Sequence, residues 1–287
     1  SEDDERLESV ELRGNSRVTA SKYAPGALQS VTGRDMDLKY GPDGESLEHV
    51  LITGDAVLQL AGQKSASGRQ IKATILDIGL AADGSTPVAV IGREAVQLTF
   101  QAEQGVGSRT ITAMNLDARG EPGKGLTKAL FTGAGTPGCA DRRTAGPECY
   151  VEYREQNAGA GRVAKAGSLE VALKPGMSSI EEANFSQWVR FNEGLLGTVA
   201  AHAKYVPDTG TLELSGTEPG TTFTYVINEQ IRIDATRIDV TLAGPKMKAT
   251  GKVSSVLQPP KPTEKKGDTK MPSMLKDDQV VYVAGDD

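Results

Sequence analysis

The stretch QIRIDATRIDVTLAGPKMKATG, residues 230–251, holds two runs in which apolar and polar residues alternate, with a short turn between them. Alternation with a period of two is typical of a β-strand that has one buried and one exposed face. A related hairpin, QIKATILDIGLAADGSTPVAVIG, occurs at residues 70–92. The chain therefore repeats one hairpin pattern, and neither copy contains an obvious catalytic residue.

The alternation slips inside the first of these stretches. Ala235 and Ile238 are three residues apart, whereas a regular strand would place same-face residues two apart. A local irregularity is needed to keep both side chains on one face of the sheet. We therefore expect a β-bulge or a kink near Thr236 and Arg237.

Period-two runs continue along most of the chain and end in turn sequences such as GPDG at 41–44, ADGS at 82–85 and PDTG at 207–210. The segment SSIEEANFSQWVRF at 178–191 fits neither the strand period nor the helix period well. A helical turn capped by a serine is one interpretation of it, and we assign it as a strand.

The hairpin pattern recurs along the chain, in segments 33–60, 68–100, 109–133, 166–194, 198–216 and 231–257. Recurrence at intervals of roughly 30–35 residues is typical of repeat architectures. A single hairpin cannot bury its apolar face alone, whereas stacked copies bury a continuous apolar interior. The sequence therefore predicts an all-β, antiparallel fold of stacked hairpins.

Composition limits the possible functions. The chain has 287 residues, 38% hydrophobic and 24% charged, with a net charge of -6 and a pI near 5.2. An acidic chain does not suit a nucleic-acid partner held through its phosphates. No run of 18 apolar residues is present, and the start SEDDERLESV lacks a signal-peptide pattern. We expect either a cytosolic chain or a mature product that lacks its targeting segment.

Two cysteines, Cys139 and Cys149, lie ten residues apart in a loop rich in glycine and proline. A metal site would need more ligands at closer spacing, and a redox pair is more often CxxC. We therefore expect a local disulfide, with free thiols as the alternative. Such a bond would contribute roughly 2–3 kcal/mol and would indicate an oxidising compartment such as the periplasm.

No residue pattern in the chain points to catalysis. His49 and His202 have no serine, cysteine or aspartate at a spacing that indicates a catalytic site. The glycine-rich pieces GVGS and GAGTPG lack the strand and helix context of a phosphate-binding loop. We expect no catalytic residue, no metal site and no cofactor, and the chain is not predicted to be an enzyme.

Three segments carry a resemblance to a known family: ELRGNSRVTAS at 11–21, SGRQIKATILDIGLAADGSTPVAVIGREAVQLTF at 67–100 and RIDATRIDVTLAGPKMKATGKV at 232–253. They resemble the OstA-like lipopolysaccharide-transport family, which includes the periplasmic proteins LptA and LptC and the N-terminal domain of LptD. The resemblance covers most of residues 10–257. The cysteine loop at 133–149 and the segment around Trp188 match no part of the family pattern.

The resemblance implies a fold, an open V-shaped β-jellyroll (a β-taco) of stacked antiparallel hairpins. Because the chain is longer than one such domain, we expect two in line. Residues 1–150 would form the first portion and 151–257 a second portion continuous with it. The proline- and lysine-rich segment 258–270 reads as a flexible linker, and 271–287 as the start of a further strand or unit.

The resemblance also implies a function in outer-membrane biogenesis. The chain would be a periplasmic component of a lipid-transfer bridge, anchored to the membrane through a missing N-terminal segment. It would bind the acyl chains of lipopolysaccharide or a related glycolipid in an apolar groove and pass them from the inner to the outer membrane. Burial stabilises an acyl chain by about 0.8 kcal/mol per methylene. Other jellyroll transport proteins would join end to end by strand addition.

The expected groove consists of inward-facing apolar residues of the strands. They are Met36, Leu38, Ile71, Ile75, Val90, Leu98, Leu169, Val171, Phe223, Tyr225, Ile233, Ile238 and Val240. The same residues would form the core of any β protein. Two alternatives therefore remain open: a structural or adhesive β-solenoid scaffold with a dry packed core, and an enzyme or carbohydrate-binding β domain.

Overall fold

The computed structural model describes residues 6–21, 24–62, 68–102, 107–136, 139, 145–156, 161–218, 221–244, 246–257 and 281–283. Within these residues the chain consists of β-strands, turns and short 3-10 turns. The all-β prediction is confirmed. The segment 178–191 forms strand β11 and not a helix. The expected linker at 258–270 and most of the expected unit at 271–287 lie outside the described residues.

The strands follow one another along the whole chain. Their bounds are β1 (Ser9–Thr19), β2 (Leu28–Tyr40), β3 (Leu47–Leu60), β4 (Arg69–Leu80), β5 (Pro87–Phe100), β6 (Arg109–Glu121), β7 (Gly125–Thr132), β8 (Val151–Glu155), β9 (Arg162–Ala166), β10 (Ser168–Leu173), β11 (Ile180–Glu193), β12 (Leu196–Val206), β13 (Thr211–Ser215), β14 (Thr224–Ile227), β15 (Ile231–Ala235), β16 (Arg237–Thr241), β17 (Lys246–Thr250), β18 (Ser254–Leu257) and β19 (Val281–Val283). Two 3-10 turns, η2 (Pro147–Cys149) and η3 (Pro175–Met177), lie in the loops.

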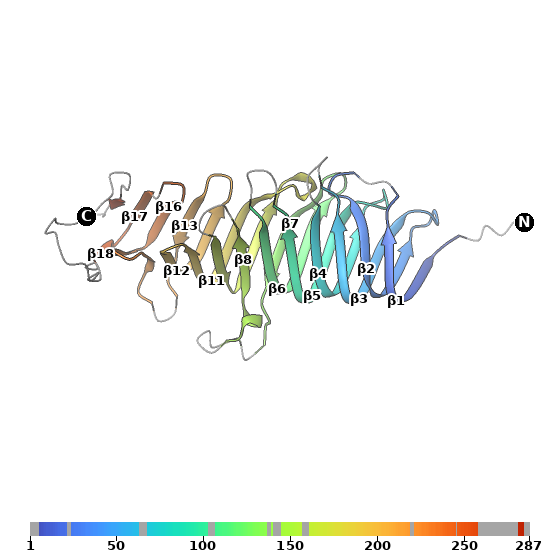
Figure 1. Ribbon diagram of the computed structural model, residues 1–287, viewed down its shortest axis with the longest axis horizontal. Helices are drawn as coiled ribbons and strands as arrows, with labels where there is room; N and C mark the ends of the chain where they lie inside the picture. The colour runs from blue at the N-terminus through green and yellow to red at the C-terminus, as the bar shows by residue number, and fades with distance from the viewer. Residues whose placement is uncertain are drawn as a thin grey trace, which may run out of the picture.

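All of these strands belong to one hydrogen-bonded sheet, and the molecule is elongated. The strands stand side by side across its long axis, with β1 near one end and β18 near the other (Figure 1). Every pair is antiparallel except that of β17 with β19, which is parallel. The antiparallel prediction is therefore confirmed for the body of the sheet.

The long strands bend in the middle, and the bends divide the sheet into two halves. Half A comprises 9–13 of β1, 35–40 of β2, 47–53 of β3, 75–80 of β4, 87–93 of β5, 115–121 of β6, β7, β10, 180–186 of β11, 202–206 of β12, β13, β16 and β17. Half B comprises the remaining part of each long strand together with β8, β9, β14, β15 and β18.

The line of bends, here called the corner, is made by β-bulges on alternate long strands. Each bulge holds two consecutive residues in the left-handed region, with φ between 51° and 77°. An extra residue of this kind bends a strand and sharpens its twist. The pairs are Gly14–Asn15 in β1, Gly54–Asp55 in β3, Glu94–Ala95 in β5 and Gln187–Trp188 in β11. A further left-handed pair, Gly251–Lys252, lies between β17 and β18.

Other strands cross the corner without a left-handed pair, and their buried residues change phase there. A small buried alanine is followed by the next inward apolar residue three positions later, at Ala73 and Leu76, Ala113 and Leu116, and Ala235 and Ile238. At the last of these, β15 ends at Ala235 and β16 begins at Arg237. Thr236 between them donates its N–H to the Gly251 carbonyl at 2.8 Å. The expected kink near Thr236 is therefore confirmed.

The middle of the molecule contains a closed ring of six strands. Strand β6 pairs with β7 in half A and with β8 in half B. The half-A path continues from β7 to β10 and β11, and the half-B path continues from β8 to β9 and the same β11. This closure differs from the expected open sheet of stacked hairpins, because the pairing of β7 with β10 joins strands that are distant in sequence. The pairings of β6 with β8 and of β7 with β10 also cross the expected boundary at residue 150.

The inner faces of the two halves pack on each other and form one continuous apolar core. Aromatic rings meet across this interior. The half-B ring of Tyr153 lies 6.0 Å from Phe185 and 6.0 Å from Tyr205, both in half A. Phe191 of half B lies 5.6 Å from Tyr205. Edge-on aromatic pairs contribute roughly 0.5–1.5 kcal/mol beyond their buried area, so these contacts hold the halves together.

Candidate functional site

Most of the expected groove residues lie in the apolar interior. Ten of them are 0–3% exposed: Met36, Leu38, Ile71, Val90, Leu98, Leu169, Val171, Ile233, Ile238 and Val240. They come from both halves and belong to the same core cluster. This cluster runs along the sheet, from Met36 in β2 to Val240 in β16.

Ile75 does not face the interior, and its inward assignment was wrong. Strand β4 crosses the corner between Ala73 and Leu76, so its buried positions change from odd to even numbers. Leu76 and Ile78 are fully buried, whereas Ile75 is half-buried. The simple alternation Ile71-Ala73-Ile75 does not account for this change of phase.

Phe223 and Tyr225 were also wrongly assigned inward. Strand β14 pairs with β15 so that Thr224 lies opposite Ala235 and Val226 opposite Ile233, and these are the buried residues. Tyr225 is therefore on the other face, where the Arg232 guanidinium lies 3.9 Å from its ring centroid. The larger apolar residues of this strand, Tyr225 and Ile227, are thus out of phase with the buried ones, and the pairing with β15 determines which face lies inside.

The interior is filled by the protein's own side chains. Two hollows, of about 220 Å³ and 250 Å³, lie on the outer face. The first lies between β6, β8 and η2 and includes Thr112, Pro147 and Lys165. The second lies over β12, β13 and β16 and includes Lys204, Glu213 and Asp239. Of the expected groove residues only Val240 contributes to their lining, in the second hollow.

A row of charged residues runs along the edge of half B that is farthest from the corner. We call Arg69, Arg109, Glu155, Arg162 and Glu193 the rim row. Arg109 lies opposite Glu155, Glu155 opposite Arg162, and Arg162 opposite Glu193 in the strand register. The charges therefore alternate in sign from strand to strand. All four of these side chains are largely buried, at 8%, 3%, 12% and 20% exposed, respectively.

Glu155 is the centre of the rim row. Its carboxylate accepts hydrogen bonds from the Tyr153 hydroxyl at 2.8 Å and the Tyr205 hydroxyl at 3.1 Å. Arg162 donates to the other carboxylate oxygen at 3.3 Å, and the Arg109 Nε lies 3.4 Å from Glu155 Oε2. A buried carboxylate is tolerated when it is paired and hydrogen-bonded in this way.

Arg162 joins the two halves of the sheet. It donates to Glu193 at 2.9 Å within half B and to the Tyr205 hydroxyl at 2.7 Å in half A. Its guanidinium carbon also lies 5.8 Å from the centroid of the Tyr205 ring. Tyr205 is thus the half-A residue through which the central part of the rim row bonds to the opposite wall.

Arg69 makes a second bridge nearer the N-terminal end. Its Nε donates to the Met177 carbonyl at 2.9 Å, and its other guanidinium nitrogen donates to the Ser178 carbonyl. Both carbonyls belong to the turn that includes η3, at the end of half A. The guanidinium also lies 5.6 Å from the centroid of Phe100, a favourable cation–π distance.

Backbone contacts close the same edge close to Arg69. The Leu28 N–H of half B donates to the Ser85 carbonyl of a half-A turn at 2.8 Å. Gly26 approaches Gly176 so closely that a Cβ on Gly26 would lie 2.5 Å from the Gly176 Cα. Gly26 also has a φ of 79°, so glycine is required there on two grounds. The two walls therefore touch along the edge opposite the corner as well as at the corner.

The environment of the rim row shifts the pKa values of its partners. Burial, with the nearby charge of Glu155, raises the pKa of Tyr153 and of Tyr205. Both hydroxyls therefore stay protonated and act as donors at neutral pH. Burial works against the charge on Arg162, yet Tyr205, Glu193 and Glu155 together raise the pKa of Arg162.

The rim row was not among the predicted site residues, although the sequence contains its signal. Each charged residue stands in phase with buried apolar residues of its own strand. Arg109 precedes Ile111 and Ala113 at intervals of two, and Glu155 follows Tyr153 in the same way. A charge in the inward phase of an alternating strand indicates a buried ionic contact.

The two ends of the sheet have free edges within the described part of the chain. Strand β1 pairs only with β2, and β18 pairs only with β15. At the β1 end, Val10 and Leu12 are only partly buried against the core. At the β18 end, Val256 and Leu257 are 55% and 62% exposed. The sheet thus ends in unpaired backbone beside apolar side chains.

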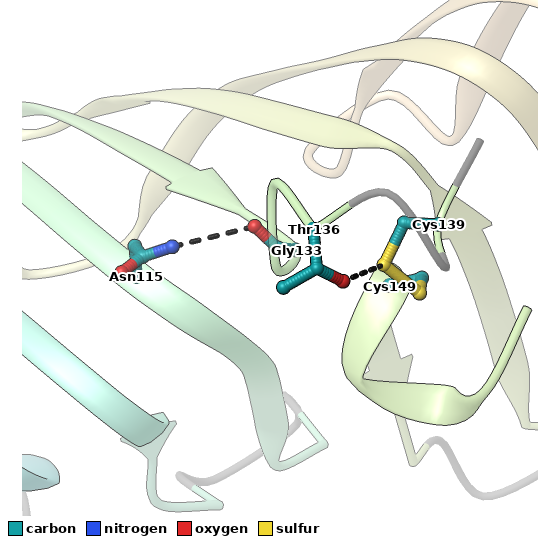
Figure 2. The surroundings of a disulfide bond; sticks show 5 residues. All are labelled: Asn115, Gly133, Thr136, Cys139 and Cys149. Atoms are coloured by element: carbon teal, nitrogen blue, oxygen red, sulfur yellow. Dashed lines mark hydrogen bonds between the residues drawn. A yellow bond between two sulfur atoms is a disulfide. The ribbon is translucent and has the colours of Figure 1, made fainter.

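The structure contains the disulfide between Cys139 and Cys149 that the cysteine spacing predicts, with Cα atoms 5.3 Å apart. Figure 2 shows the bond beside Thr136, whose hydroxyl lies 3.3 Å from the Cys139 sulfur. Asn115 of β6 donates to the Gly133 carbonyl at 3.3 Å. The bond therefore fixes the loop between β7 and β8, where the two paths of the ring separate.

The isolated histidines lie outside the interior. His49 is 2.6 Å from Asp77, and His202 is 3.2 Å from Ser186. In the described ranges no three His, Cys, Asp or Glu side chains gather as a metal site would require. No helix in the same ranges is long and apolar enough to cross a membrane.

Comparison with known proteins identifies no relative: no family model, no curated protein and no solved structure matches the chain.

Proposed function

We propose that the chain is a periplasmic component of a lipid-transfer bridge that binds the acyl chains of lipopolysaccharide or a related glycolipid. The observation that supports this most is the apolar interior, which continues from β1 to β17 between two sheet halves. Such an interior suits an acyl chain chemically, because binding there needs no directional contacts. The sequence resemblance to the OstA-like family, with its V-shaped β-jellyroll, supports the same function.

The ends of the molecule suit assembly with other sheets of the same kind. An unpaired edge strand can continue into a partner's strand through backbone hydrogen bonds. The exposed Val256 and Leu257 on β18 would then be covered. End-to-end strand addition would join the apolar interiors of successive domains into one path. The disulfide supports an oxidising compartment, which the periplasm is.

Acyl chains require space that the packed interior does not offer. They are accommodated when the two halves move apart and the interior side chains pack against the lipid in place of one another. Each buried methylene of the lipid contributes about 0.8 kcal/mol, which offsets the contacts that the halves lose.

The packed interior favours a second candidate, a structural or adhesive scaffold with a dry core. The inward residues named above are 0–3% exposed, as in the core of a fold that binds nothing inside. Binding of a lipid inside the sheet distinguishes the two functions.

Site-specific photocrosslinking tests the proposal. A benzophenone amino acid at Val171, which is fully buried in β10, is expected to form adducts with lipopolysaccharide upon irradiation. The matched control is the same amino acid at Glu170, the preceding residue, which is exposed on the outer face. Adducts at 171 and not at 170 support transfer through the interior. Absence of adducts at 171 and at the equivalent buried position Ile71 would reject it in favour of the scaffold.

A further inference from the structure

We propose that the rim row is a polar latch that holds halves A and B together and controls sideways access of acyl chains to the interior. This inference rests on the proposed function, since it names how the lipid enters. The geometry supports it through three features: the place of the row, the way its charges are balanced, and the nature of its bonds to half A.

The rim row lies where an opening would separate the walls most. The corner connects the halves covalently through the long strands, and its left-handed bulges are local bends in otherwise regular strands. The rim row lies at the opposite edge, where the walls are joined by side-chain contacts and a few backbone contacts. Rotation about the corner would therefore part the walls at the rim row first.

The charges of the row are balanced within half B. Four of its members, Arg109, Glu155, Arg162 and Glu193, pair with one another along neighbouring strands, so two positive charges meet two negative charges. When the walls part, these four ion-paired side chains keep one another as partners in half B, and burial of an unpaired charge is what makes most buried ion pairs costly to disturb. Arg69, the fifth member, donates instead to the Met177 and Ser178 carbonyls of half A, and opening breaks these bonds.

Opening also returns the row to water. Buried ion pairs carry a desolvation penalty that often equals or exceeds their mutual attraction. Exposure relieves this penalty for the rim row, whereas exposure of the neighbouring apolar interior is unfavourable. The central part of the row is thus the place along the edge at which separation costs least.

The bonds that close the latch in its centre all end on one half-A hydroxyl. Tyr205 donates to Glu155 at 3.1 Å and accepts from Arg162 at 2.7 Å. The Tyr205 ring would still pack against Tyr153 and Phe191 if the hydroxyl were absent. The substitution Tyr205→Phe therefore removes the latch bonds and keeps the core.

Distance measurement by pulsed electron spin resonance tests opening. Nitroxide labels are placed at Arg154 in β8 of half B and Lys204 in β12 of half A, both exposed on the outer face. Their outer ion pairs with Glu152 and Glu182 contribute little to stability. In the full chain with Tyr205→Phe, the ratio of long to short label distances is expected to rise about fivefold, the effect of one net buried hydrogen bond.

The matched control is Tyr225→Phe, the same change on the outer face of half B, where the ring stacks on Arg232. It is expected to leave the label distances as in the unsubstituted chain. Unchanged distances in Tyr205→Phe, or an equal change in Tyr225→Phe, would overturn the latch.

The lipid step is tested separately from opening. The photocrosslinking yield at Val171 after brief exposure to lipopolysaccharide is expected to rise severalfold in Tyr205→Phe relative to Tyr225→Phe. A longer label distance without a higher yield would overturn control of access by the latch. Absence of adducts in every variant would reject the proposed function instead, while the label distances still report whether the latch opens.

Discussion

Two tyrosines and one glutamate show how single residues determine the interior. Tyr153 and Tyr205 donate to the same carboxylate of Glu155 from opposite walls, and all three are at most 3% exposed. Phenol groups suit this place because they bring a donor into an apolar core on a large apolar ring. Their protonated state is part of the packing, since a buried tyrosinate would face the Glu155 carboxylate without a proton to share.

The raised pKa values of Tyr153 and Tyr205 predict a specific alkaline behaviour. A group whose pKa is raised in the folded state contributes stability fully below its unfolded pKa, and that stability is lost as pH rises toward the folded value. Unfolding is therefore favoured above roughly pH 10, the ordinary tyrosine value. Absorbance of tyrosinate is expected to show these two residues ionising only together with loss of the β spectrum. Their ionisation in the folded chain would contradict the described environment.

Ile233 and Arg232 provide a test of which face of β15 is inside. Ile233 is fully buried and Arg232 is on the outer face beside Asp234. Ile233→Asp is expected to lower the free energy of unfolding by about 3–5 kcal/mol, because it buries an unpaired charge. Arg232→Asp should cost less than about 1 kcal/mol. Chemical denaturation measures both, and equal losses would show that the assigned faces are wrong.

At the scale of elements, the fold depends on the corner. In strands with a left-handed pair, the buried residues on either side of the corner are four positions apart, as Ile52 and Ala56 are. In the neighbouring strands the corresponding residues are three positions apart. The strands with a left-handed pair therefore hold one extra residue at the corner, and this residue forms the bulge. The corner bends the sheet so that both halves can bury their inner faces on each other.

Ala95 lies in the bulge of β5 with a φ of 51°, a conformation that costs a residue with a Cβ roughly 1–2 kcal/mol. Ala95→Gly is expected to raise the free energy of unfolding by about 0.5–1 kcal/mol, after the entropic cost of glycine. The control is Ala89→Gly in the same strand, which has ordinary strand geometry and is expected to lose about 0.5–1 kcal/mol. The same sign for both would contradict the assigned bulge.

The disulfide stabilises the loop that separates the two paths of the ring. Replacement of both Cys139 and Cys149 by serine is expected to lower the free energy of unfolding by roughly 2–3 kcal/mol. The β spectrum should be retained, because both cysteines lie in loops and the strand pairs of the ring do not include them. Thermal unfolding followed by circular dichroism measures both quantities. Loss of the β spectrum would show that the loop is needed for the ring to form.

On the scale of the whole molecule, the sheet combines a covalent corner, a non-covalent rim and two ends whose edge strands, β1 and β18, each pair on one side only among the described residues. Each corresponds to one step of the proposed transfer. The rim row would admit the lipid, the apolar interior would shield it, and the ends would join the next domain. In the six-strand ring the walls are joined by the two bent strands β6 and β11, and β7 and β10 of half A and β8 and β9 of half B complete the ring between them.

Much of the fold could be predicted from alternation alone, because each strand shows its buried face in its own residues. The phase slip from Ala235 to Ile238 even located a crossing of the corner. Other features depend on partners distant in sequence. The inward face of β14 is set by its pairing with β15, and the ring is set by the pairing of β7 with β10.

The rim row was missed for a related reason. A charged residue at a strand end usually faces water, and at the last residue of a strand the alternation no longer indicates which face the side chain is on. Glu155 is buried because Tyr205, fifty residues later, and Arg109 pack against it. Its local sequence shows only that Glu155 is in phase with the buried residues of its strand. The side chains that pair with its charge come from other strands.

The most direct test of the central claim is binding of intact and deacylated lipopolysaccharide to the purified chain, followed by native mass spectrometry. If the apolar interior carries acyl chains, the intact glycolipid forms a stable complex with the folded chain, and the deacylated sugar does not bind. Equal binding of both forms would indicate recognition of the sugar on the outer surface. Binding of neither would leave a dry scaffold and contradict the proposed function.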